Sequence, residues 1–120
     1  MSNAFRVVVR KDPQGRFAVL ATDGYVNHLA GEQLGEAANL LLAEGYTRLV
    51  INLEQSTVAS STGVSCLAAV VERVHEGHGS LAFCHLTRTL QKTFAIMGLS
   101  RHRALYETEE EAVRGLLADG

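Results

Sequence analysis

The chain has 120 residues, of which 47% are hydrophobic, and this composition suits a single domain over residues 1–120 with one core. A formal net charge of -2 and only 11 Lys and Arg residues, without a basic block, argue against nucleic-acid binding. No apolar run approaches the length of a membrane span, and the amino terminus lacks a basic segment followed by an apolar one. We therefore expect a cytoplasmic protein without membrane insertion.

The first part of the chain predicts a hairpin and then a helix. Residues 5–11 and 16–22 are rich in β-branched and apolar residues, and residues 12–15 between them have the composition of a tight turn. Residues 29–44 then predict a helix that stops at Gly45. The apolar residues at helical spacing in this segment are Leu34, Ala37, Ala38, Leu41 and Leu42.

The middle of the chain predicts a strand, a polar turn and a second helix in immediate succession. Residues 48–53 are apolar on both faces, which is typical of a strand buried between helices. Residues 60–63 form a hydroxyl-rich turn, and the helix that follows ends at Gly77. The apolar face of this helix comprises Val64, Leu67, Ala68, Val71 and Val74.

The last part of the chain continues the alternation of strands and helices. Residues 80–84 predict another buried strand, and residues 104–106 a short edge strand. Between them, a helical stripe of Leu90, Phe94 and Met97 stops at Gly98. Thr108 and Glu111 match a capping box at the start of a final helix that reaches about residue 117.

This order of elements predicts an α/β domain with a mixed sheet. The amino-terminal hairpin is antiparallel, and the later strands are parallel through right-handed crossovers. About four helices should pack mainly on one face of the sheet. Because the apolar helix faces are used by this core, we expect a monomer before any partner binds.

Several reactive side chains have ordinary structural interpretations. Cys66 and Cys84 lie in apolar segments without metal-ligand spacing, so we expect reduced, buried thiols. His75 and His78 fall near a helix end, where imidazoles suit the negative end of the dipole better than a metal site. Surface loops account for His85, Arg88, Arg101 and His102, with contact to an acidic partner as the alternative.

The turn before the second helix has two compatible interpretations from its residues alone. Hydroxyl side chains are favoured at helix starts, so Ser60, Ser61 and Thr62 can simply cap the helix, as Asn27 can cap the first one. A helix start also leaves backbone N–H groups that can hold an anion or a modified hydroxyl. No G-x-S-x-G elbow or G-x-x-x-x-G-K-[ST] loop occurs, which argues against an enzyme.

Residues 49–67, LVINLEQSTVASSTGVSCL, resemble the signature of STAS domains, the fold of bacterial anti-sigma factor antagonists. In that family a strand and a loop lead into an Asp-Ser-Ser/Thr-Gly motif before a helix. The resemblance extends upstream to residues 24–27, which are similar to a Gly-x-x-Asp segment, and downstream to residues 98–99. It therefore covers nearly the whole chain in register and implies the STAS fold.

The resemblance also implies a regulatory switch. In the family, the unphosphorylated antagonist binds an anti-sigma factor that is also a serine kinase, and phosphorylation of the motif serine ends the binding. Ser61 stands at the position of that serine. The partner-binding residues implied by the resemblance are Asn27, His28, Ser60, Ser61, Thr62, Gly63 and Val64.

Three positions depart from the family pattern. Asn27, Asn52 and Ser60 stand where the family usually has acidic residues, and neutral groups cannot pair with a cationic partner as a carboxylate can. A second interpretation follows from this difference. The chain would then be a diverged STAS adaptor that is not phosphorylated and works within a larger signalling or transport assembly.

Overall fold

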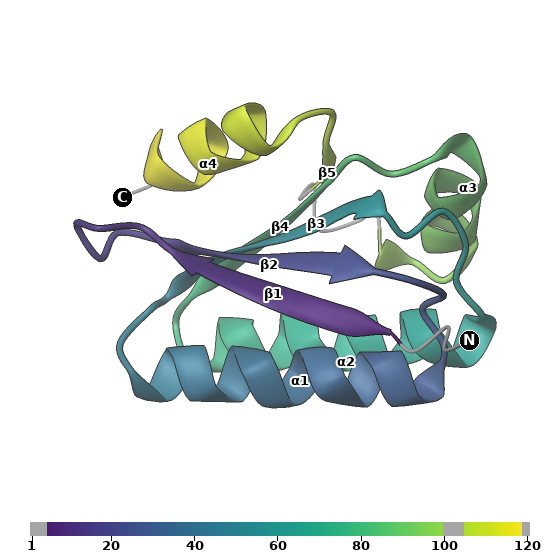
Figure 1. The fold of residues 1–120 in the computed structure, drawn as a ribbon, viewed down its shortest axis with the longest axis horizontal. Helices are drawn as coiled ribbons and strands as arrows, with labels where there is room; N and C mark the ends of the chain where they lie inside the picture. Colours follow the sequence, from purple (N-terminus) through teal and green to yellow (C-terminus); the bar gives the residue numbers. More distant parts are fainter. Residues whose placement is uncertain (1–4, 100–104, 119–120) are drawn as a thin grey trace.

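A computed structural model describes residues 5–99 and 105–118 and divides them into five strands and four helices (Figure 1). No helix among these residues is both long enough and apolar enough to span a bilayer. In chain order the elements are β1 (Arg6–Lys11), β2 (Ala18–Asp23), α1 (His28–Ala43), β3 (Arg48–Gln55), α2 (Ser61–Glu76), β4 (Ser80–Cys84), α3 (Arg88–Ile96), β5 (Leu105–Tyr106) and α4 (Glu109–Ala118).

The five strands form one sheet in the order β1-β2-β3-β4-β5. β1 and β2 are antiparallel, whereas the other neighbouring pairs are parallel, which confirms the predicted hairpin and mixed sheet. The predicted edge strand is present as β5, although Ala104 lies outside the described residues. Because β2 to β5 run in one direction, their carboxyl ends meet at a single edge of the molecule.

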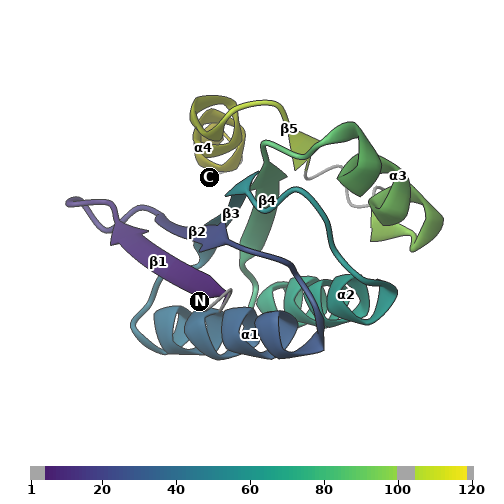
Figure 2. The same cartoon turned by 45° about the vertical axis from the view of Figure 1, so that its right-hand side comes forward.

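Side chains of the central strand alternate between two cores. Leu49, Ile51 and Leu53 lie in the larger core, and Val50 lies in the smaller core on the opposite face. α1 and α2 cover the first face side by side, and α4 lies across the second (Figures 1 and 2). α3 contributes Leu90 and Phe94 to the larger core, so three of the four helices contribute to that core, as expected.

The predicted stripe of α3 is wrong at its last position. Leu90 and Phe94 are buried, and the Phe94 ring packs edge-on against Phe83 with 5.1 Å between the ring centroids. Met97, however, follows the last helical residue as the C-cap and is exposed. Because α3 ends at Ile96, the helical spacing no longer applies at Met97, and its side chain does not reach the core.

α1 and α2 approach most closely near their amino-terminal ends. A Cβ atom on Gly31 would lie 2.3 Å from the Cβ of Cys66, which is closer than side chains can pack. Four residues further along α1, a Cβ on Gly35 would lie 3.7 Å from Val70 Cγ2, an ordinary contact. The absence of a side chain at Gly31 therefore sets the spacing of the two helices.

A polar network attaches α4 to the sheet. Arg10 of β1 donates two hydrogen bonds to the Glu109 carboxylate, at 2.6 and 3.0 Å, and Asn52 Nδ2 donates a third at 2.9 Å. Asn52 Oδ1 in turn accepts from the Glu54 amide at 2.9 Å, so this nearly buried side chain is satisfied at both ends. The Arg10 hydrogen bonds, followed by that of Asn52, hold the pKa of Glu109 below its usual range.

The start of α4 shows a modified form of the predicted capping box. Thr108 Oγ1 accepts a hydrogen bond from the Glu111 amide at 3.2 Å, as expected. The Glu111 carboxylate accepts from the amide of Glu107, one residue before the position a capping box would use. The helix therefore begins at the predicted place, with its first turn held by both side chains.

We predict opposite effects for alanine at two glycines of α1. Gly31→Ala should lower the free energy of unfolding by about 2 kcal/mol, because the new methyl group overlaps Cys66 and pushes the helices apart. Gly35→Ala is the matched control and should raise it by about 0.5–1 kcal/mol through helix propensity. Urea unfolding followed by circular dichroism measures both, and equal effects would contradict the close approach at Gly31.

Glu109→Gln should make the protein less stable in a pH-dependent way. Because folding lowers the pKa of Glu109, its ionised form stabilises the fold above the unfolded value, about 4.3, and this contribution disappears as the pH falls through the folded value. We expect the free energy of unfolding to fall by about 1 kcal/mol at pH 7, because Arg10 is half exposed and solvent weakens its ion pair with Glu109. The difference from the parent chain should shrink below about pH 4. Glu110→Gln, at the exposed neighbouring position, is the matched control and should change the free energy of unfolding at pH 7 by less than Glu109→Gln does.

Asn52→Asp should be destabilising at neutral pH. The new carboxylate would stand within hydrogen-bond distance of Glu109 with no proton to donate, which costs about 2 kcal/mol. Adding Glu109→Gln should restore most of the stability, because the glutamine amide can donate to the new aspartate. Thermal unfolding of the two single variants and the double variant tests this coupling. Additive losses would show that Asn52 and Glu109 act independently.

Candidate functional site

Two loops are joined at the carboxyl edge of the sheet, just before α1 and α2 begin (Figure 1). Val26 and Ala59 form an isolated parallel bridge beyond the ends of β2 and β3. The Val26 amide donates to the Val58 carbonyl at 3.2 Å, and the Ser60 amide donates to the Val26 carbonyl at 2.9 Å. This pairing places the two helix starts next to each other on one surface.

Each helix start is capped by a neutral polar side chain. Asn27 Oδ1 accepts from the Ala30 amide at 2.9 Å, and Ser60 Oγ accepts from the Gly63 amide at 3.0 Å. Ser60 Oγ also lies 3.1 Å from the Thr62 hydroxyl. Capping is therefore confirmed for Asn27 and Ser60.

Ser61 is the first residue of α2, and its side chain is exposed. Its hydroxyl has no hydrogen bond to any residue that the structure describes. The first turn of α2 contains no acidic residue, and the amides of Ser61 and Thr62 have no partner within the helix. The site thus presents an accessible hydroxyl at the uncompensated positive end of a helix dipole.

The next two residues lie beneath this surface. A Cβ on Gly63 would lie 2.2 Å from the Val26 carbonyl oxygen, so only glycine fits while the two loops stay paired. Val64 is fully buried and belongs to the larger core. Its side chain is unavailable to a partner, so Val64 is not part of a partner-binding surface, contrary to the expectation from the sequence.

His28 and Cys66 connect the two helices near this surface. Cys66 Sγ lies 3.6 Å from His28 Nδ1, and His28 Nε2 lies 3.2 Å from the Glu32 carboxylate. Cys66 is half-buried, so the expectation of fully buried thiols holds for Cys84 only. Burial raises the pKa of Cys84 to about 12, which keeps this thiol protonated at neutral pH.

Three large apolar side chains are exposed on the segments next to the two helix starts. Tyr25, Leu29 and Val58 are 50%, 64% and 45% exposed, and they come from the two paired loops and the first turn of α1. These three residues are not among the candidate binding residues expected from the sequence. A signal was available, because each is a large apolar residue outside the apolar face of the neighbouring helix or strand. We call the surface formed by these three residues with Asn27, His28, Ser60, Ser61 and Thr62 the Ser61 corner.

Among the described residues, the histidines and arginines considered from the sequence do not gather at one site. His75 lies in the last turn of α2 and His78 just beyond it, and no group of three metal-binding side chains occurs within residues 5–99 and 105–118. Arg88 is the first residue of α3 rather than part of a loop, whereas Arg101 and His102 lie outside the described residues. His85 follows β4 with a left-handed backbone, φ +60, and lines a cavity.

The comparisons with known proteins agree with this architecture. The model of the family described as "STAS domain" matches residues 8–112. The chain is 30% identical over 101 residues to the anti-sigma-F factor antagonist RsfB of Mycobacterium tuberculosis strain H37Rv, covering 82% of this chain and 80% of RsfB.

Two solved structures share the fold. The structure of an anti-sigma factor antagonist from Mycobacterium paratuberculosis superposes with a TM-score of 0.81 at 19% identity, covering 97% of each chain. That of the anti-sigma factor antagonist SpoIIAA in its unphosphorylated form gives 0.73 at 24% identity, covering 93% of this chain and 97% of SpoIIAA. With the family match over most of its length, this chain belongs to the STAS domain family.

Proposed function

We propose that this protein is an anti-sigma factor antagonist that binds an anti-sigma factor with serine kinase activity and is switched off by phosphorylation of Ser61. The observation that carries the proposal is the exposed, unbonded Ser61 hydroxyl at the first position of α2. RsfB, which is 30% identical, is named as an anti-sigma-F factor antagonist, and this supports the antagonist role. We propose that the protein acts as a cytoplasmic monomer until its partner binds.

The Ser61 corner has the composition of a protein-binding surface. Tyr25, Leu29 and Val58 provide apolar contacts around the hydroxyl, and apolar patches of this kind mark interaction sites. A phosphate on Ser61 would add roughly -1.5 to -2 charges in the middle of that patch. Burying the phosphate under a partner would require its desolvation, so binding should weaken.

The fold itself should tolerate the phosphate. The first turn of α2 has no acidic residue to repel it, and the amides of Ser61 and Thr62 favour an anion there. The cap is provided by Ser60 rather than by Ser61, so the modification leaves the cap in place. The proposed switch therefore changes the partner surface without unfolding the helix.

A second candidate function is an adaptor that binds its partner through the same surface and is not phosphorylated. The observation that favours it is Ser60, whose neutral hydroxyl caps α2 where a STAS motif usually has aspartate. A kinase that recognises its substrate through that carboxylate would lack a negatively charged group to bind beside Ser61.

We predict that charge at Ser61 weakens partner binding without unfolding the domain. Ser61→Asp should reduce the affinity for the anti-sigma factor of the same organism by at least about tenfold, or 1.4 kcal/mol. Ser61→Ala should bind like the parent chain but accept no phosphate. Thr89→Asp is the control, because it adds one charge to an exposed hydroxyl position in the first turn of α3. Calorimetric titration measures binding, and circular dichroism confirms that each variant folds.

A phosphopeptide map of the protein from its own cells separates the two candidates. Phosphate on Ser61 supports the switch. A fully covered but unmodified peptide around residues 60–62, together with parental binding by Ser61→Asp, would overturn the switch and leave the adaptor.

A further inference from the structure

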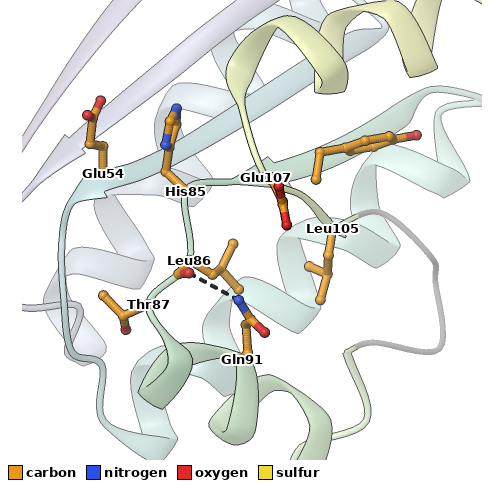
Figure 3. A pocket seen from close by; sticks show the side chains of 8 residues that line it. Glu54, His85, Leu86, Thr87, Gln91, Leu105 and Glu107 are labelled. Atoms are coloured by element: carbon orange, nitrogen blue, oxygen red, sulfur yellow. Dashed lines mark hydrogen bonds between the residues drawn. The ribbon is translucent and has the colours of Figure 1, made fainter.

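A cavity of about 510 Å³ opens beyond the carboxyl ends of β3, β4 and β5 (Figure 3). Glu54 lines it from β3, the segment from His85 to Thr87 lines it after β4, and Gln91 contributes from α3. Leu105 and Glu107 close it from β5 and the turn before α4. Its volume is in the range of small-ligand sites, and it is built from segments far apart in the sequence.

The lining of the cavity is acidic. The carboxylates of Glu54 and Glu107 have no hydrogen bond or ion pair with any described residue, and none of the residues lining the cavity is Lys or Arg. Among the described residues of the lining, His85 is the one imidazole, so the two carboxylates outnumber it and disfavour anions, including phosphate groups. A cation would gain both a favourable charge interaction and hydrogen bonds to carboxylate oxygens.

The shape of the cavity favours a flat cation on an apolar stem. Leu86 and Leu105 provide apolar walls, and Figure 3 shows the Glu107 carboxylate directed into the space between them and Gln91. Gln91 Nε2 donates to the Leu86 carbonyl at 3.2 Å, which leaves the amide oxygen of Gln91 as a further acceptor. Methylene groups packed on leucine and planar donors paired with a carboxylate describe an arginine side chain.

A hydrogen bond joins the rim of the cavity to the loop that leads into the Ser61 corner. The Thr87 hydroxyl, at the rim, donates to the Thr57 carbonyl at 3.0 Å. Thr57 belongs to the loop between β3 and α2 that also carries Val58 and Ser60. A protein seated on the corner would therefore reach the cavity across a single loop.

We propose that this cavity receives an arginine side chain of the protein that binds the Ser61 corner. The identity of that partner rests on the proposed function, but the chemistry of the cavity does not. Leu86 and Leu105 contact the methylene groups of the arginine, and the carboxylate of Glu107 accepts from its guanidinium, while Glu54 adds negative charge at the rim of the cavity. The contact adds specificity for a cationic partner to the apolar and polar contacts of the Ser61 corner.

A small probe tests the chemistry of the cavity. Acetyl-arginine-N-methylamide, titrated into the ¹⁵N-labelled chain, should shift the amide signals of residues 54, 85–91 and 105–107. Acetyl-citrulline-N-methylamide has nearly the same shape without the charge and should bind at least fivefold more weakly. Glu107→Gln should weaken the arginine probe at least threefold, whereas Glu110→Gln, exposed and outside the cavity, should not. Equal binding of both probes, or shifts elsewhere, would overturn the proposal.

Partner binding tests the source of the arginine. The double variant Glu54→Gln and Glu107→Gln should bind the anti-sigma factor at least tenfold more weakly than the parent, with Glu110→Gln unchanged. Gln91→Lys places a cation in the cavity from an exposed helix position and should have the same effect if the double variant does not fold. Binding of the arginine probe combined with unchanged partner affinity would mean that the cavity takes a free guanidinium compound, which overturns the proposal.

The same titrations distinguish failure of this inference from failure of the phosphorylation switch. Weaker binding by the cavity variants but not by Ser61→Asp would support the arginine contact and remove the charge switch at Ser61. Weaker binding by Ser61→Asp, with unchanged binding by the cavity variants, would support the charge switch and overturn the arginine contact.

Discussion

The pairing of the Val26 carbonyl with the Ser60 amide holds the functional end of the molecule together. This carbonyl also lies against Gly63, so the bond forms only if the first turn of α2 presents bare backbone at that point. Once it forms, α1 and α2 start side by side, and Asn27 and Ser60 cap them on the same surface. The exposed position of Ser61 follows from this arrangement.

The neutral residues at the usual acidic positions of the family are integrated into the hydrogen bonding of this chain. Asn27 and Ser60 satisfy amides at helix starts, which a carboxylate would also do. Asn52 differs, because its amide donates a hydrogen bond to the Glu109 carboxylate, which also accepts hydrogen bonds from Arg10. An acid in β3 would repel that carboxylate, so the amide at Asn52 and the glutamate at the start of α4 belong together. The amide at position 52 is therefore explained by its hydrogen bond to Glu109 at the start of α4.

Local patterns were sufficient to predict the order of strands and helices. Apolar periodicity and stop residues such as Gly45 depend only on neighbours in the chain, and the hairpin, the parallel strands and the capped helix starts followed from them. Periodicity alone places Met97 in the core, because it does not indicate where α3 ends. The motif alone places Val64 on a partner surface, whereas its helical position favours the core, where the structure has it.

The parts of the site that the sequence did not reveal are formed by contacts between distant segments. The bond between Asn52 and Glu109 joins residues 57 positions apart, and no spacing in the sequence indicates it. The cavity combines Glu54, Gln91 and Glu107, which have no common motif and meet only because three strands end at one edge. The exposure of Tyr25, Leu29 and Val58 in the Ser61 corner could not be predicted either, because it depends on how the two loops pair.

For the proposed switch at Ser61, the energetics favour an effect of charge at the surface over a change of shape. A hundredfold loss of affinity requires about 2.7 kcal/mol, and the cost of desolvating a phosphate beneath a partner reaches several kcal/mol. A conformational switch would have to break the Val26 pairing or separate α1 from α2, and both are fixed by close backbone contacts at Gly63 and Gly31. Adding charge at Ser61 leaves these contacts intact. The proposed switch would therefore need only a rigid end of the sheet and an exposed hydroxyl at Ser61.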